Sequence, residues 1–221
     1  MHMTTGTRVR RLPTEIARAP LRTIRPVMLR DVYANPEKEL VRLRRNGLLV
    51  QIGHGTYVAK PDTVAPDEAW KPVFEEAAMA YATAAYGDKV PVLVGLGAAR
   101  HWQAIPRAIG VTVIAVPEQH RPVVLTTGGR VVFTRRDTSR IDAIPVTVEL
   151  GVMRVARIEQ TLTDLVTHPN LGGMPAEARA AAEALLDRVE AERLALVMHD
   201  LSSRQFAATR DWLQQRGYEL V

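Results

Sequence analysis

The chain has no cysteine among its 221 residues, which excludes disulfides, thiolate zinc sites and cysteine nucleophiles. It has only three serines, and none lies in a Gly-x-Ser-x-Gly sequence, so the nucleophile elbow of a serine hydrolase is excluded as well. Long apolar runs are also missing, because the longest, such as residues 90–95 and 111–116, have the length of strands. We therefore expect a cytoplasmic protein with no membrane contact.

Positive charge is concentrated near the N-terminus. The first 60 residues contain 12 Lys and Arg against 4 Asp and Glu, whereas the other 161 residues contain 17 basic and 20 acidic side chains. A compact basic segment is typical of a surface that neutralises phosphates, and it favours fast, salt-sensitive association with nucleic acid.

The same segment has the element order of a winged helix-turn-helix. Residues 1–12 are polar and basic without periodicity, which predicts a flexible basic arm. Proline, glycine and β-branched positions then predict helices over residues 13–19, 30–34 and 35–46, followed by a hairpin with strands over residues 48–52 and 56–59. We predict a DNA-binding domain over residues 13–61.

The third helix of this domain has the clearest boundaries in the chain. Asn35 is a good N-cap, the proline after it suits a first helical position, and Gly47 suits the left-handed residue after a helix. At about 100° per residue, Leu40 and Leu43 lie on one side. One face can therefore pack while the other points at DNA.

The opposite side of this helix supplies the main candidate DNA contacts. We expect Arg42 and Arg45 to reach base edges or phosphates in the major groove, and Lys38 to bind the backbone. His54 and Thr56 would lie at the wing tip, near the flanking backbone or minor groove. The remaining candidates for phosphate contact are Arg22, Arg25 and Arg30.

The remainder of the chain predicts an α+β domain over residues 66–221, after a Pro- and Asp-rich linker. A helix over residues 68–86 and another over 98–105 accompany strands over residues 90–95, 111–116, 122–126, 130–135, 146–150 and 153–156. Helices follow over residues 158–167, 175–191, 192–199 and 204–216. Strands grouped before helices indicate an α+β fold, in which a larger domain of both sheet and helices has a helical C-terminus.

Two sequence patterns in this domain could hold a ligand, but a structural role explains each better. A strand runs into Gly95-x-Gly97, as in dinucleotide-binding proteins, yet Arg100 occupies the third glycine position and no suitable acid follows. Asp164 and His168 have a spacing that could bind a metal, although a histidine in the last turn also suits the helix dipole. We therefore expect neither a nucleotide site nor a metal site.

Three segments resemble the AbiEi family of type IV toxin-antitoxin antitoxins. Residues 43–57, LRRNGLLVQIGHGTY, resemble that family's basic helix and Gly-x-Gly wing, and residues 94–102 lie where it has a small-residue turn into a helix. Residues 158–165, IEQTLTDL, resemble its Arg-Thr-Leu-x-Asp-Leu helix, followed by NLGG. This chain departs from the family in having Gly97 where serine is more common and Gln160 in place of the arginine. The resemblance spans about residues 13–190.

The resemblance implies an antitoxin that represses its own operon through the N-terminal domain and neutralises a partner nucleotidyltransferase toxin. Its partners would be operator DNA and the cognate toxin, with no catalytic residue and no cofactor. Two alternatives stay open. One is an atypical protein-serine kinase that phosphorylates the toxin with ATP and Mg²⁺, although no phosphate-binding or kinase loop is present. The other is a plain winged-helix transcriptional regulator with a ligand-sensing body.

Overall fold

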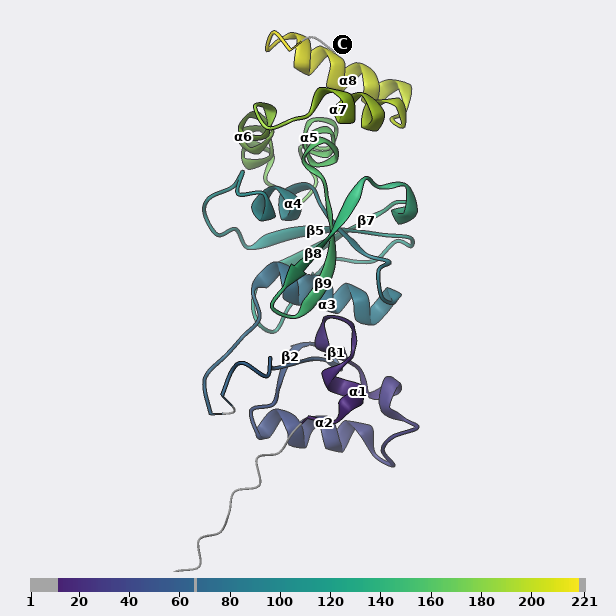
Figure 1. The fold of residues 1–221 in the computed structure, drawn as a ribbon, viewed down its shortest axis with the longest axis vertical. Helices are drawn as coiled ribbons and strands as arrows, with labels where there is room; N and C mark the ends of the chain where they lie inside the picture. Colours follow the sequence, from purple (N-terminus) through teal and green to yellow (C-terminus); the bar gives the residue numbers. More distant parts are fainter. Residues whose placement is uncertain (1–11, 66, 219–221) are drawn as a thin grey trace, which may run out of the picture.

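The computed structural model describes residues 12–65 and 67–218, so the predicted basic arm lies outside the described residues except for its last position. The fold is α+β, as predicted: a small three-stranded sheet with helices, then a six-stranded mixed sheet, then C-terminal helices. These parts follow one another along the longest axis (Figure 1). We call residues 12–60 the head and residues 70–218 the body.

The head contains seven short elements. These are α1 (Thr14–Ala17), η1 (Pro20–Arg22), β1 (Thr23–Ile24), η2 (Pro26–Leu29), α2 (Pro36–Arg45), β2 (Leu49–Gly53) and β3 (Thr56–Ala59). The helix predicted over residues 30–34 is wrong, because residues 30–32 form a turn. The short helix is the 3₁₀ turn η2, which begins four residues earlier because Pro26 presets its first position.

The predicted boundaries and faces of α2 are confirmed. The Asn35 side chain accepts a hydrogen bond from the Lys38 backbone N–H at 3.0 Å, and Gly47 has a φ of 72°. Leu40 and Leu43 are 0% and 2% exposed in a hydrophobic core that belongs to the head alone. The opposite face of α2 is thereby left on the outside of the molecule.

The body is built around a mixed sheet with the strand order β6-β7-β5-β4-β9-β8. Only the pairs β5–β7 and β4–β9 are parallel. The elements are α3 (Phe74–Tyr86), β4 (Val92–Val94), α4 (Gly95–His101), β5 (Val111–Val116), β6 (Val123–Val124), β7 (Arg130–Arg135), η3 (Thr138–Arg140), β8 (Ala143–Val148) and β9 (Gly151–Ala156).

Two body helices differ from their predicted bounds. α3 begins at Phe74 rather than at residue 68, because Pro72 disfavours helical backbone in the residue before it. α4 begins at Gly95, three residues early, because the glycine takes a φ of 51° and turns the chain directly after β4.

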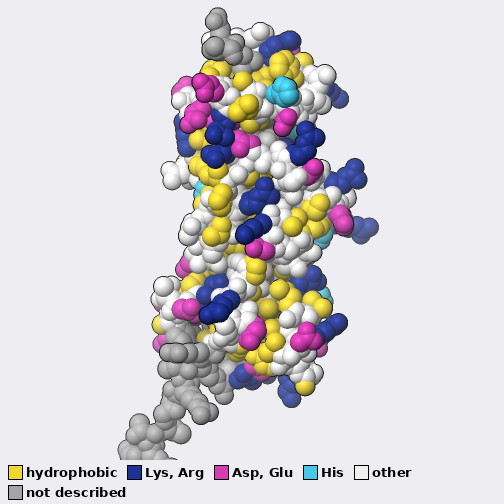
Figure 2. All heavy atoms as spheres, turned by 45° about the vertical axis from the view of Figure 1, so that its right-hand side comes forward, with side chains coloured by type: hydrophobic (Ala, Val, Ile, Leu, Met, Phe, Trp, Pro, Cys, Tyr) yellow, Lys and Arg dark blue, Asp and Glu magenta, His cyan; other side chains and the backbone are white. Residues whose placement is uncertain are grey.

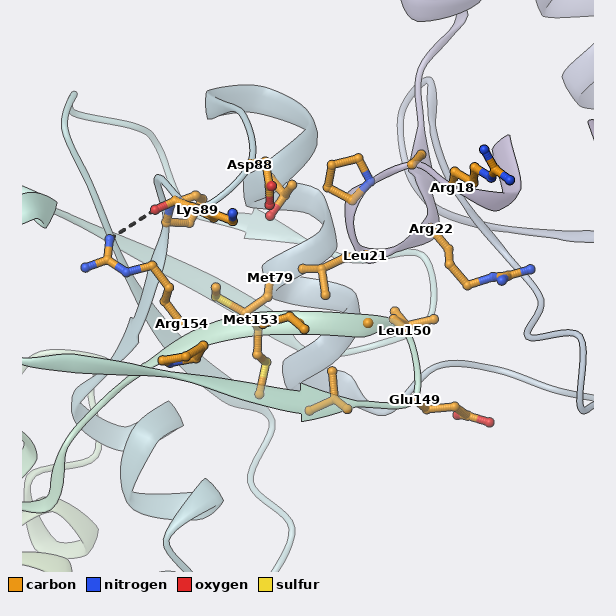
Figure 3. A pocket seen from close by; sticks show the side chains of 18 of the residues that line it. Arg18, Leu21, Arg22, Met79, Asp88, Lys89, Glu149, Leu150, Met153 and Arg154 are labelled. Atoms are coloured by element: carbon orange, nitrogen blue, oxygen red, sulfur yellow. Dashed lines mark hydrogen bonds between the residues drawn. The ribbon is translucent and has the colours of Figure 1, made fainter. Parts of the chain in front are cut away.

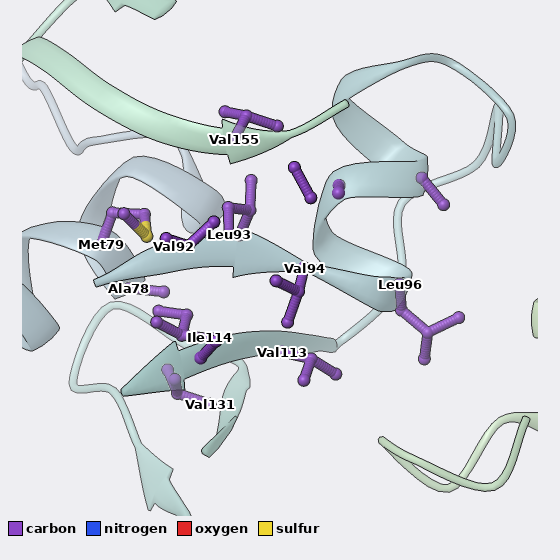
Figure 4. Close-up of a cluster of buried hydrophobic side chains, with 14 of the residues drawn as sticks. Ala78, Met79, Val92, Leu93, Val94, Leu96, Val113, Ile114, Val131 and Val155 are labelled. Carbon is purple, nitrogen blue, oxygen red and sulfur yellow. The ribbon is translucent and has the colours of Figure 1, made fainter. Parts of the chain in front are cut away.

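The main core lies on the central strands of this sheet. β4 and β5 are buried along their whole length, and Met79 of α3 packs with Val92 and Ile114 in the same cluster (Figure 4). Four helices then complete the chain, as predicted: α5 (Ile158–Thr167), α6 (Pro175–Leu186), α7 (Ala191–His199) and α8 (Ser203–Gln214). No helix in the described ranges is both long and apolar enough to cross a membrane.

The head and body share a packed interface. The three-stranded sheet, in the order β1-β3-β2, contacts α2 and also α3 of the body. The Thr126 backbone N–H donates to the Ile52 carbonyl at 3.0 Å, and the Thr126 hydroxyl donates to the Gln51 carbonyl. Gly53 lies against the ring of Tyr81, where a Cβ would approach ring carbon Cε2 to 2.7 Å. The hairpin is therefore held by the body along one strand.

Candidate nucleic-acid interface

The outer face of α2 gathers the basic side chains that the sequence predicts. Lys38, Arg42 and Arg45 are all exposed, and the helix lies at the end of the molecule opposite the C-terminal helices (Figure 1). With Asn35 and Asn46, they border a hollow of about 460 Å³ beside the helix. Basic side chains also lie over the body (Figure 2). The head and the body therefore differ in net charge rather than in the presence of Lys and Arg.

Arg42 is held in place by a carboxylate that sequence reasoning missed. Its Nε donates to Glu39 Oε2 at 2.8 Å and its Nη2 donates to Glu39 Oε1, and this hydrogen bonding raises the pKa of Arg42. The i, i+3 spacing of Glu39 and Arg42 in a predicted helix is the signal that could have found the pair. One edge of the guanidinium is thus occupied, and Nη1 remains available.

The other basic side chains of α2 differ in their surroundings. Arg44 donates through Nη1 to Gln51 Oε1 of β2, which directs it toward the hairpin. Lys38 and Arg45 form no ion pair with any side chain in the described part of the chain. These two are therefore the cations of α2 most accessible to an external anion.

At the hairpin, one predicted contact is exposed and the other is buried. His54 lies exposed at the tip. Thr56 is only 2% exposed, and its hydroxyl lies 3.3 Å from the His54 carbonyl, to which it donates. The predicted role of Thr56 is therefore corrected: it begins β3, the central strand of a sheet that is covered on both faces.

Arg22 also has a structural role in place of the predicted phosphate contact. Its Nη2 donates to the Lys60 carbonyl at 2.9 Å and pairs with Asp62 at 3.1 Å, while its Nε donates to the Ala59 carbonyl at 3.3 Å. Its guanidinium therefore fastens the end of β3 to the start of the head. Arg25 is half-buried and Arg30 is exposed, so both keep their predicted role as hypotheses.

The two ligand-like patterns of the body are used in packing. A Cβ on Gly97 would lie 2.3 Å from Thr112 Oγ1, so this glycine brings α4 close to β5. Asp164 is 7% exposed and binds Arg136 Nη1 at 2.7 Å and Gln160 Nε2 at 2.9 Å. Across residues 12–65 and 67–218, no three His, Cys, Asp or Glu side chains are grouped to hold a metal.

A buried carboxylate fixes the turn between β8 and β9, and it carries a pH prediction. Glu76 is 8% exposed, and its Oε2 accepts a hydrogen bond from the Leu150 N–H at 3.1 Å. Burial raises the pKa of Glu76 above its ordinary value. Protonated Glu76 therefore stabilises the fold fully at pH values below the ordinary pKa of glutamate. This stabilisation is lost as the pH rises through the raised pKa that Glu76 has in the folded state.

We expect Glu76→Gln to have a higher free energy of unfolding than the wild type at pH 7 and an equal one at about pH 3, where the carboxyl is protonated in both states. The amide keeps an oxygen for Leu150 and removes the buried charge. Urea unfolding of both proteins at the two pH values measures this. A variant less stable at pH 7 would show that the carboxylate is favourably placed.

The fold has a counterpart among solved structures. The chain is similar to the crystal structure of the RV2827C protein from Mycobacterium tuberculosis, with a TM-score of 0.59 and 19% sequence identity, over 95% of this chain and 79% of that one. No family model matches the sequence, and no curated protein matches it. At this identity the likeness concerns the fold alone.

Proposed function

We propose that this chain is a DNA-binding antitoxin: α2 binds operator DNA and represses the chain's own operon, and the body neutralises a nucleotidyltransferase toxin. The observation that carries the DNA-binding half is the exposed basic face of α2, with Lys38, Arg42 and Arg45 opposite the buried Leu40 and Leu43. The resemblance of three sequence segments to AbiEi antitoxins supports the other half.

The dimensions of α2 suit a major groove. Its ten residues span about 15 Å, and a major groove admits one α-helix. Arg45 follows Arg42 by three positions, so the two side chains are neighbours on the helix surface. Because Glu39 already fixes the Arg42 guanidinium, less side-chain entropy is lost when Arg42 binds a base edge or a phosphate.

The hairpin contributes less to this interface than a free wing would. Its strand β2 is joined to the body through Thr126, and β3 is buried throughout. Only the tip at His54 and Gly55 is open to a ligand. We therefore assign most of the DNA contact to α2, with His54 at the flanking backbone.

The DNA half is tested by fluorescence anisotropy of the intact chain on duplex from upstream of its own gene and on a scrambled duplex of equal composition. We expect tighter binding to the upstream duplex, about 10³-fold or more, and a logarithm of the binding constant that falls with the logarithm of salt concentration. Equal affinity for both duplexes would contradict an operator-specific role.

The toxin half is tested by co-expressing the intact chain with the nucleotidyltransferase encoded beside it. We expect the chain to rescue growth from the toxin. If it does not, the alternative of a plain winged-helix transcriptional regulator is favoured. Incubating both proteins with labelled ATP and Mg²⁺ then separates the kinase alternative, because an unlabelled toxin that is nevertheless neutralised excludes phosphorylation.

A further inference from the structure

A large cleft lies between the head and the body, beside their packed interface. It measures about 930 Å³ and lies between residues 17–22 of the head and the β8–β9 hairpin with α3 of the body (Figure 3). Small-molecule sites typically have about 300–1,000 Å³ and occur preferentially between structural units. Its apolar lining includes Pro20, Leu21, Met79, Pro145, Val152 and Met153.

The head wall of the cleft is strained. Leu21 and Arg22 have φ values of 48° and 50°, a left-handed conformation that costs a residue with a side chain about 1–2 kcal/mol. Leu21 nevertheless inserts into the body core, where it is 3% exposed. Backbone strain of this kind is concentrated at functional sites, where the surrounding structure maintains it.

One end of the cleft carries positive charge that the protein does not neutralise. Arg154 donates to the carbonyls of Lys89 and Thr138, each at 3.0 Å, and forms no ion pair within the described ranges. Arg154 is half-buried, and this burial lowers the pKa of its guanidinium. Lys89 is exposed beside it, and the neighbouring acid is Asp88 (Figure 3).

The opposite end is closer to neutral. There, Arg22 is paired with Asp62, while Arg18 lies beyond it on the rim. Glu149, on the hairpin side, accepts hydrogen bonds from Trp70 Nε1 at 3.2 and 3.3 Å. The cleft is therefore polarised: an apolar middle leads to the unpaired cations Lys89 and Arg154.

We propose that this cleft binds a small amphipathic anion, with its apolar part against Pro20, Pro145 and Val152 and its anionic group facing Lys89 and Arg154. The site does not depend on the proposed DNA-binding role, because it uses none of the side chains on the outer face of α2. Its ligand would contact head and body at once.

Calorimetry and thermal unfolding of the intact chain with decanoate test this assignment, with decan-1-ol and decyltrimethylammonium as neutral and cationic probes of equal chain length. We expect decanoate to bind at one site and raise the melting temperature, and the other two to bind more weakly. Failure of decanoate to bind, or equal binding of all three, would overturn the proposal.

Two exposed positions test the charge. Lys89→Gln removes an attracting cation and should weaken decanoate binding about two- to fivefold, whereas Asp88→Asn removes the repelling acid and should strengthen it by a similar factor. Opposite shifts are required, and shifts in the same direction in both variants would contradict the proposed position of the carboxylate.

The location is tested by filling the cleft. Val152 lines it and is 51% exposed, so Val152→Trp should occupy the volume without disturbing the core and abolish decanoate binding. Val124→Trp is the matched control, because Val124 is 72% exposed on β6 at the far edge of the sheet. Unchanged binding by the Val152 variant would overturn the assignment.

Discussion

Replacing Arg42 and Arg45 together with alanine is expected to lower the affinity for upstream DNA by about 100-fold or more. A good arginine contact to a base is worth about 1–3 kcal/mol, and the double variant removes two candidates from one helix face. Both side chains are exposed and alanine favours helix, so the fold should be retained. Anisotropy titrations at fixed salt give the measurement, and circular dichroism verifies the helix content.

The matched control removes the same charge from the other end of the molecule. Arg204 and Arg210 are exposed on α8, far from α2 (Figure 1), so their double alanine variant should bind DNA within about twofold of the wild type. The Arg42 and Arg45 variant should also still rescue growth from the toxin. If the Arg42 and Arg45 variant still binds upstream DNA, α2 is not the recognition helix.

Substituting Gly97 with alanine is expected to destabilise the body by about 1–3 kcal/mol, the usual cost of overpacking a core. The new Cβ would lie 2.3 Å from Thr112 Oγ1 and 2.6 Å from Leu93 Cδ1, and both residues are fully buried. Since each kcal/mol lowers the melting temperature of a chain of this size by about 2–4 °C, calorimetry can resolve the loss.

Gly110→Ala provides the comparison for this prediction. A Cβ on Gly110 meets no atom within 4 Å, so this variant should keep the wild-type melting temperature or raise it slightly. Equal melting temperatures for the two alanine variants would show that α4 can move away from β5. The close packing at Gly97 would then not explain why the Gly-x-Gly turn is present.

Elements with local signals were predictable from the sequence. The bounds of α2 follow from Asn35, Pro36 and Gly47, and the buried face follows from the leucine spacing. The wrong helix at residues 30–34 also rested on a local signal. A weak helical pattern indicated that helix, whereas Pro26 presets a 3₁₀ turn that begins four residues earlier.

The candidate site was predictable only where it depends on one helix. Lys38, Arg42 and Arg45 are exposed because the helix period places them opposite the core. The burial of Thr56 and the pairing of Arg22 depend on contacts that cross from one part of the chain to another, such as Arg22 with Asp62 forty positions away. No local periodicity encodes such contacts, and the head–body cleft likewise arises only from the folded arrangement.

The packing of the head's sheet against the body has a consequence for cleavage of the chain. Ile52 and Val58 belong to the hydrophobic cluster of the body, although they lie on the head's own strands. A protease that cut between residues 61 and 65 and let the pieces separate would expose these side chains to water. Such a fragment would be prone to aggregation, so a cut in the linker should remove the proposed repression and the proposed toxin neutralisation together.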